Sequence, residues 1–166
     1  MWALVALAVT AFAGGTTHGF PGLPGALPWP LWKTAQVAIG MVAFFVTRGT
    51  VLWHFPARMS RVVQSIAALQ LAIYLGWIAG HDEFIYSIVD YGIAFGFALV
   101  VYARAALKRM DSSSHWIASG ILVSFAAAGI QAFGLAPHPN FNHNDLYHVV
   151  QIFGTWLIYR GVRSTV

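Results

Sequence analysis

The chain has 166 residues, of which 58% are hydrophobic and only 8% are charged, with a formal net charge of +4. Soluble domains carry about 25% charged residues, so this composition excludes an ordinary soluble fold. The sequence contains no cysteine, which excludes disulfides, thiolate metal sites and cysteine catalysis.

Six apolar segments follow one another along the chain, and a helix needs about 20 mostly apolar residues to cross a bilayer. The first and last segments are short, whereas the middle four approach this length. The segments are Trp2–Gly14, Thr34–Trp53, Val62–Gly80, Phe84–Ala103, Trp116–Ala136 and Leu146–Tyr159. The sequence therefore predicts an all-α integral membrane protein, in which residues 1–166 form one domain, a single bundle of six transmembrane helices.

Alternate loops between these segments are basic. They hold or adjoin eight of the nine Lys and Arg residues, which are Arg48, Arg58, Arg61, Arg104, Lys108, Arg109, Arg160 and Arg163. The positive-inside rule places these loops and both termini in the cytoplasm. We therefore predict a multi-pass protein of the bacterial inner membrane, with membrane lipids as partners. Because topology explains the positive charge, no nucleic-acid partner is expected.

The remaining loops are Thr16–Lys33, Gly80–Glu83 and Pro137–Asp145, and Lys33 is their only basic residue. Thr16–Lys33 is rich in glycine and proline, so we do not expect it to form regular helix. These non-cytoplasmic segment ends gather four of the five acids and five of the seven histidines: Asp82, Glu83, Asp90, Asp145, His18, His81, His138, His143 and His148. Ionisable groups at a membrane boundary are costly unless they serve a function, and metal binding is the first candidate.

His18 follows the first segment and His148 opens the last, so both imidazoles are expected at similar depth, where they could bind Zn²⁺, Fe²⁺ or Cu²⁺. His81 begins the turn before the fourth segment, where an ordinary solvated turn explains it equally well. Asp90 lies six residues past Phe84, which is roughly 9 Å along a helix. With no Lys or Arg at comparable depth, its partner is expected to be a histidine, a metal or a tyrosine hydroxyl, unless Asp90 is protonated.

Asp145 and His148 are three residues apart and so share one helix face. The carboxylate could bind a metal with the imidazole or orient it. Asn144 or Asp145 is also expected to be the helix N-cap, and capping alone would explain Asp145. For His148 we favour a functional role, because it lies inside the span. We predict zinc as the cofactor, the metal ligands His18, His81, His148 and Asp90, and the catalytic carboxylates Asp90 and Asp145.

The runs GGTTH, ending at His18, and NDLYH, ending at His148, resemble the superfamily of alkaline ceramidases and progestin/adipoQ receptors. The resemblance implies a fold of transmembrane helices and a histidine-bound zinc ion that activates water to hydrolyse lipid amides. Only His18 and His148 match the family's motif. Asn144 stands where the motif has another histidine, so Asp90 or His81 would have to replace the missing ligand.

Three functional hypotheses follow. The first is a metal-dependent hydrolase of a lipid amide or ester, in which metal-bound water attacks and Asp90 or Asp145 accepts its proton. The second is a non-enzymatic transmembrane subunit of a larger complex or homo-oligomer, which the low charge and 15% aromatic content fit equally well. The third is a transporter or proton relay that uses Asp90 and His148. It ranks last because no segment carries a mid-membrane proline break.

Overall fold

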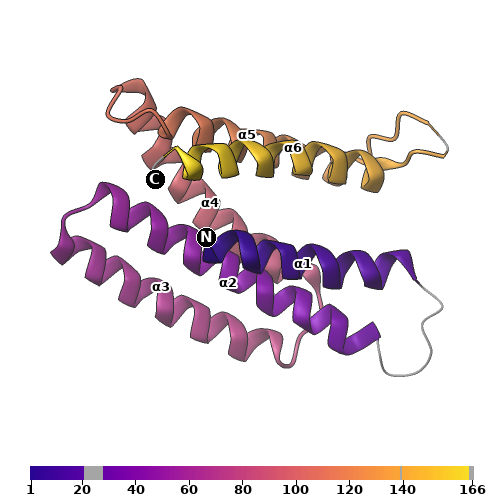
Figure 1. Ribbon diagram of the computed structural model, residues 1–166. Helices are drawn as coiled ribbons and strands as arrows, with labels where there is room; N and C mark the ends of the chain where they lie inside the picture. The colour runs from indigo at the N-terminus through magenta and orange to yellow at the C-terminus, as the bar shows by residue number, and fades with distance from the viewer. Residues whose placement is uncertain (21–27, 139, 165–166) are drawn as a thin grey trace. The chain divides into compact units, whose positions relative to one another are not determined.

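The computed structural model describes residues 1–20, 28–138 and 140–164. Over these residues the regular structure consists of six α-helices, and no strand is present. The prediction of an all-helical chain with six helices is therefore confirmed (Figure 1). The helices are α1 (Trp2–Gly19), α2 (Pro28–His54), α3 (Ala57–Ile78), α4 (Phe84–Leu107), α5 (Ser114–Phe133) and α6 (His143–Arg163).

The expectation that Thr16–Lys33 contains no regular helix is wrong at both ends of that stretch. Helix α1 continues to Gly19 and α2 already begins at Pro28, whereas residues 21–27 lie outside the described part of the chain. Proline is tolerated in the first turn of a helix, because the N–H group that it lacks would have no helical partner there. The glycine and proline content therefore marks helix ends rather than a loop of the predicted length.

Four described helices are long and apolar enough to cross a membrane. These spans are Trp29–His54, Ala57–Ile78, Phe84–Leu107 and Ser114–Phe133. They correspond to the four middle segments expected from the sequence.

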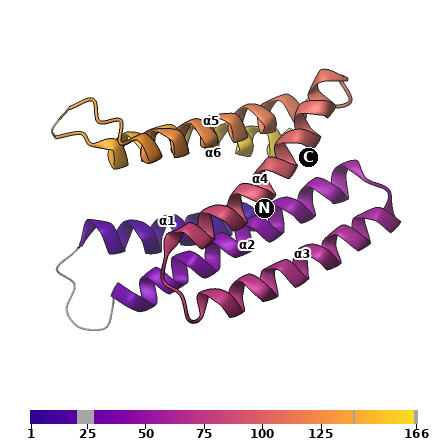
Figure 2. The same ribbon diagram turned by 180° about the vertical axis from the view of Figure 1, so that it is seen from behind.

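The chain divides into two compact units, Met1–Ala98 and Leu99–Val166. In the first unit α1, α2 and α3 lie side by side, and α2 packs closely against both neighbours (Figures 1 and 2). The contact between α2 and α3 is tight at Gly40, where a Cβ atom would lie 2.6 Å from the ring of Tyr74. The Tyr74 hydroxyl group donates to the carbonyl of Gln36 at 2.9 Å and lies 2.8 Å from the Ser87 Oγ. Tyr74 thereby links α3 to both α2 and α4.

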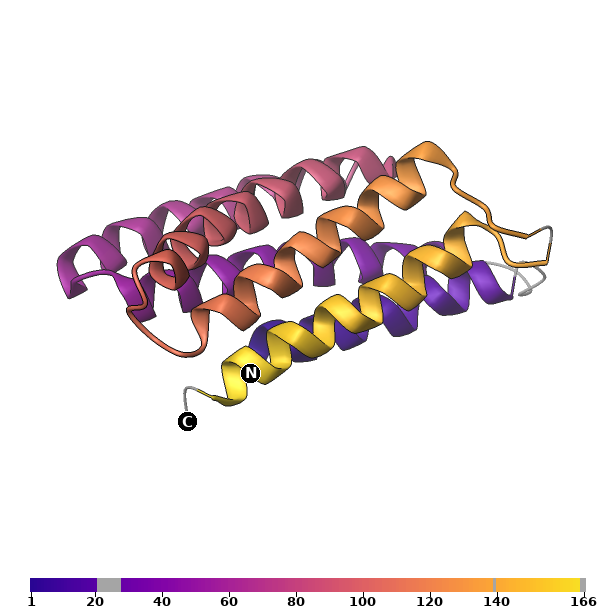
Figure 3. The same cartoon turned by 90° about the horizontal axis from the view of Figure 1, so that it is seen from above.

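In the second unit α5 and α6 pack closely as an antiparallel pair (Figure 3). Glycine makes this approach possible, because a Cβ atom on Gly120 would lie 2.6 Å from the carbonyl oxygen of Gly154. The helices of membrane proteins commonly approach one another through such small residues.

The N-terminus of α5 is capped by Asp111, an acid for which the sequence suggested no role. Its carboxylate accepts hydrogen bonds from the backbone N–H and hydroxyl groups of Ser113 and Ser114. Burial raises the pKa of Asp111, but these hydrogen bonds outweigh burial and hold the pKa below its usual range. Asp111 therefore stabilises the helix start as a carboxylate.

We predict that Gly120→Ala weakens the α5–α6 pair. The added methyl group would lie 2.6 Å from both the Gly154 carbonyl oxygen and the Ile158 side chain. Such overpacking typically costs about 1–3 kcal/mol, so the midpoint of thermal unfolding in detergent should fall. Gly129→Ala in the same helix is the control, because nothing lies within 4 Å of the position that its Cβ would occupy. An equal loss in both variants would contradict this account of the pair.

Candidate functional site

The turn between α3 and α4 is tied to the start of α2 by three side chains, those of Trp32, Lys33 and Gln36, which we call the α2 clasp. The indole N–H of Trp32 donates to the backbone carbonyl of Asp82 at 2.9 Å. The amide of Gln36 donates to the same carbonyl at 3.2 Å. Two donors thus converge on one carbonyl group of the turn.

Lys33 supplies the third element of the clasp. Its ammonium group donates to the carbonyls of Ile78, at the end of α3, and of His81, and it forms an ion pair of 2.7 Å with Asp82. A cation at this position satisfies carbonyls that lack helical partners and complements the negative end of the α3 dipole. The Lys33 hydrogen bond lowers the pKa of the Asp82 carboxyl from its ordinary value.

Two of the predicted metal ligands lie near this turn. The imidazole of His81 stacks on Trp77 with 4.2 Å between ring centroids, and its Nδ1 lies 2.8 Å from the Trp77 carbonyl oxygen. His18 is exposed at the end of α1 and meets the ring of Trp32 edge-on at 5.8 Å. The structure therefore gives His81 a hydrogen-bonded packing role, whereas the His18 side chain contacts the α2 clasp.

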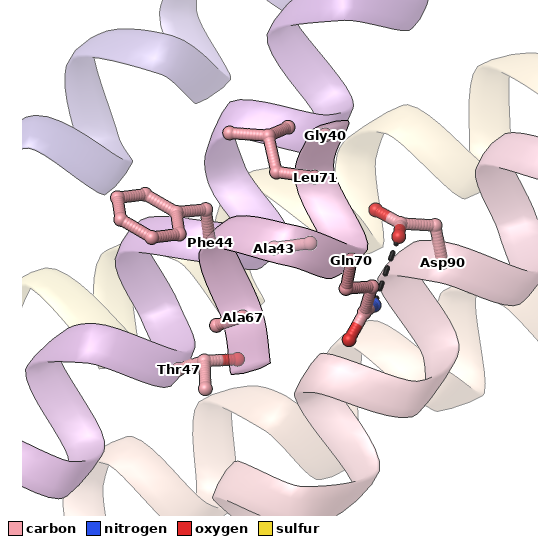
Figure 4. Close-up of a pocket in the computed structure, with 8 residues that line it drawn as sticks. All are labelled: Gly40, Ala43, Phe44, Thr47, Ala67, Gln70, Leu71 and Asp90. Atoms are coloured by element: carbon pink, nitrogen blue, oxygen red, sulfur yellow. Dashed lines mark hydrogen bonds between the residues drawn. The ribbon is translucent and has the colours of Figure 1, made fainter. Parts of the chain in front are cut away.

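Asp90 is buried on α4, with a relative exposure of 7%. One carboxylate oxygen accepts a hydrogen bond of 2.9 Å from the amide of Gln70 on α3 (Figure 4). Gln70 was not among the partners expected from the sequence. The hydroxyl group of Tyr74, also on α3, bonds to Gln36 and Ser87 and not to Asp90. The second Asp90 oxygen, Oδ2, is buried and has no hydrogen-bond partner among the described residues.

Two hollows adjoin this carboxylate. A cavity of about 10 Å³ lies beside Asp90 and Gln70 and is lined by α2, α3 and α4. A wider groove of about 470 Å³ runs between α3 and α4 and is lined mostly by apolar side chains, including Leu69, Ile73 and Ile93. A polar pair therefore lies between a water-sized cavity and an apolar groove.

In the second unit, the start of α6 holds the other predicted residues. The N-cap is Asn142, so the prediction of Asn144 or Asp145 at that position is wrong. The Asn142 side chain accepts from the N–H groups of Asn144 and Asp145, and the Asp145 carboxylate accepts from the Asn142 N–H at 2.9 Å, which completes a capping box. His148, one turn further on, is exposed. Its ring lies 4.9 Å from that of Tyr147.

No group of three His, Asp or Glu residues that could hold a metal ion occurs within the described ranges. His18, His81 and Asp90 belong to the first unit, and His148 belongs to the second. The zinc site and the catalytic roles of Asp90 and Asp145 therefore stay predictions.

Comparison with known proteins places the chain by family. A family model matches residues 1–165, and it describes a family of unknown function, DUF6962. The chain belongs to this family. The match extends over both units, so the whole helical chain, rather than one of its units, corresponds to the DUF6962 family. No curated protein and no solved structure matches the chain.

We predict that Lys33→Met destabilises the protein more than Asp82→Asn does. The first change removes the ion pair and leaves the carbonyls of Ile78 and His81 without their donor. The second removes only an ion pair whose aspartate side chain is 61% exposed, and exposed pairs contribute little. Thermal unfolding midpoints and proteolysis at the turn would rank the two variants. A larger loss in Asp82→Asn would contradict the capping role of Lys33.

The pH dependence gives a second measure of this ion pair. Folding lowers the pKa of Asp82, so the pair stabilises the folded state above the unfolded pKa of about 3.9. That contribution is lost as the pH falls through the folded pKa. The difference in stability between the wild type and Asp82→Asn should therefore be present at neutral pH and disappear in strong acid.

Proposed function

We propose that the chain is a multi-pass protein of the bacterial inner membrane that acts as a non-enzymatic transmembrane subunit of a larger complex. In this proposal all six helices cross the bilayer and both termini lie in the cytoplasm. Four helices of suitable length and apolarity support membrane insertion. The alternation of loops rich in Lys and Arg with loops whose only basic residue is Lys33 supports the orientation.

The observation that carries the subunit proposal is an apolar stripe along α3. Its members recur every three or four residues, are each 49–64% exposed, and are Val62, Ile66, Leu69, Ile73 and Trp77. Residues at this spacing share one helix face. In a bilayer this face would contact lipid or another protein.

The groove beside this stripe favours a protein partner. Its α4 wall includes Val89 and Ile93, which are 53% and 60% exposed, and its volume is about 470 Å³. A groove between two helices can receive the side chains of a third, as in knobs-into-holes packing. Transmembrane helices associate chiefly through such close packing, because lipid offers no hydrophobic driving force. We therefore assign the α3–α4 groove to a transmembrane helix of a partner subunit.

This assignment predicts that Leu69→Trp disrupts the complex. Tryptophan would fill the groove but keep the segment apolar, so insertion into the membrane should be unaffected. On a native gel in mild detergent, the wild type should migrate above the size of one chain, and Leu69→Trp should shift to the single-chain size. Val9→Trp is the matched control, because Val9 is also exposed on an apolar helix, α1, but lies outside the groove. A wild type that migrates as a single chain would refute the subunit proposal.

A zinc-dependent hydrolase of a lipid amide or ester is the second candidate. One observation favours it: the side chains of His18 and His148 are exposed, and within the described residues neither ring makes a hydrogen bond. Imidazole nitrogens are common metal ligands. The sequence prediction names these two residues as ligands with His81 or Asp90, and metal-bound water would be the nucleophile.

The hydrolase candidate predicts about one zinc ion per chain in detergent-purified protein, measured by elemental analysis. His18→Ala and His148→Ala should each lower the zinc content strongly, since a site with few ligands depends on each of them. His115→Ala is the control, because His115 belongs to α5 and to none of the predicted sites. Protein that stays free of metal after incubation with zinc would eliminate this candidate.

A further inference from the structure

One oxygen of the buried Asp90 carboxylate has no hydrogen-bond partner among the described residues around it. Gln70 donates to Oδ1, whereas Oδ2 has no partner among the described residues and is inaccessible. Buried polar atoms are nearly always hydrogen-bonded, and a charged one inside a membrane segment is especially costly. An unpartnered oxygen at this position therefore indicates that something else belongs beside it.

The cavity next to Asp90 has room for one small occupant. Its volume of about 10 Å³ is close to the minimum that holds a single water molecule. Besides Asp90, the polar residues of its lining are Gln70 and Thr47, and Gly40, Ala43, Phe44, Ala67 and Leu71 complete it. In Figure 4 one oxygen of Asp90 is bonded to Gln70 and the other points toward the side where Gly40 and Leu71 lie.

The charges around the cavity select the kind of occupant. Asp90 is the only charged side chain in its lining, and the nearby tyrosine, Tyr74, is already engaged with Gln36 and Ser87. One positive charge would neutralise the carboxylate, whereas a divalent ion would leave a net charge buried in an apolar surrounding. Asp90, Gln70 and Thr47 can each offer a side-chain oxygen as a ligand, and hard cations prefer oxygen ligands.

We propose that Asp90, Gln70 and Thr47 form a binding site for one monovalent cation, with Na⁺ as the ion to test. The site lies within the first unit and needs neither the partner helix nor the zinc ion of the functions proposed above. It would anchor α4 to α2 and α3 through a shared ion, because the three residues come one from each helix. The unit would then be more stable in sodium than in a large organic cation.

The test compares thermal unfolding of the full chain in detergent in sodium chloride and in choline chloride, at equal ionic strength and with a chelator to remove divalent ions. A ligand that binds only the folded state raises the unfolding midpoint, and a well-occupied site should give a shift of about 5 °C in sodium. Asp90→Asn, which keeps the size of the side chain, should lose this shift, and Thr47→Val should reduce it. Asp82→Asn, a change at an exposed aspartate, should keep it.

Binding of radiolabelled sodium to the purified protein gives a second readout. If Asp90→Asn fails to fold, the comparison of sodium binding between the wild type and Thr47→Val tests the proposal in its place. Equal midpoints in sodium and choline, with no sodium bound, would overturn the proposal and leave a water molecule or a proton as the partner of Asp90. A sodium shift that persists in Asp90→Asn would also overturn it, because the effect would then come from another part of the protein.

Discussion

The backbone carbonyls at the end of α3 need new partners where the chain turns toward α4, and side chains of α2 supply them. Lys33 donates to the carbonyls of Ile78 and His81, while Trp32 and Gln36 donate to that of Asp82. The last carbonyls of a helix have no helical partner, so side chains from elsewhere in the protein can satisfy them. This requirement explains why a basic residue, Lys33, occurs at the start of α2. It also fixes where α4 begins, and with it the position of Asp90.

The helices of the two units pack in different ways. Helices α5 and α6 approach through glycines, so their backbones touch and little space remains between them. Helices α3 and α4 are joined instead by long polar side chains, in the Gln70–Asp90 and Tyr74–Ser87 pairs. Such pairs keep two helices apart, because their side chains fill the space between the backbones. Glycines would instead let the backbones touch. The groove between α3 and α4 is a consequence of this spacing. The same spacing that leaves this groove therefore also places a carboxylate next to a cavity.

The number and order of the helices could be predicted because apolar segment length is a property of the sequence alone. The helix ends were less predictable, since Pro28 lies within the first turn of α2, and Thr16 and Thr17 donate to the carbonyls one turn earlier in α1. The candidate site was predicted only in part. The sequence singled out Asp90 by its depth, but its partner Gln70 is uncharged and gives no comparable signal. The role of Lys33 was missed because it depends on carbonyls that lie 45 and 48 residues away. Capping at Asn142 could have been found, because an Asn three residues before an acid matches the capping box.

The exposure of the two predicted catalytic carboxylates bears on how a hydrolase could work in this chain. Asp145 is exposed, but its Oδ2 already accepts the Asn142 N–H in the capping box. Asp90 has a free oxygen, but it is 7% exposed, and that oxygen is buried. A general base must reach the water that it deprotonates. Asp90 would therefore need an opening between α3 and α4, whereas Asp145 would need only to break its hydrogen bond to the Asn142 N–H group. A cation or a partner helix makes no such demand, because a small ion fits a small cavity and a helix binds an open groove. The observed geometry thus suits binding at Asp90 more readily than proton transfer.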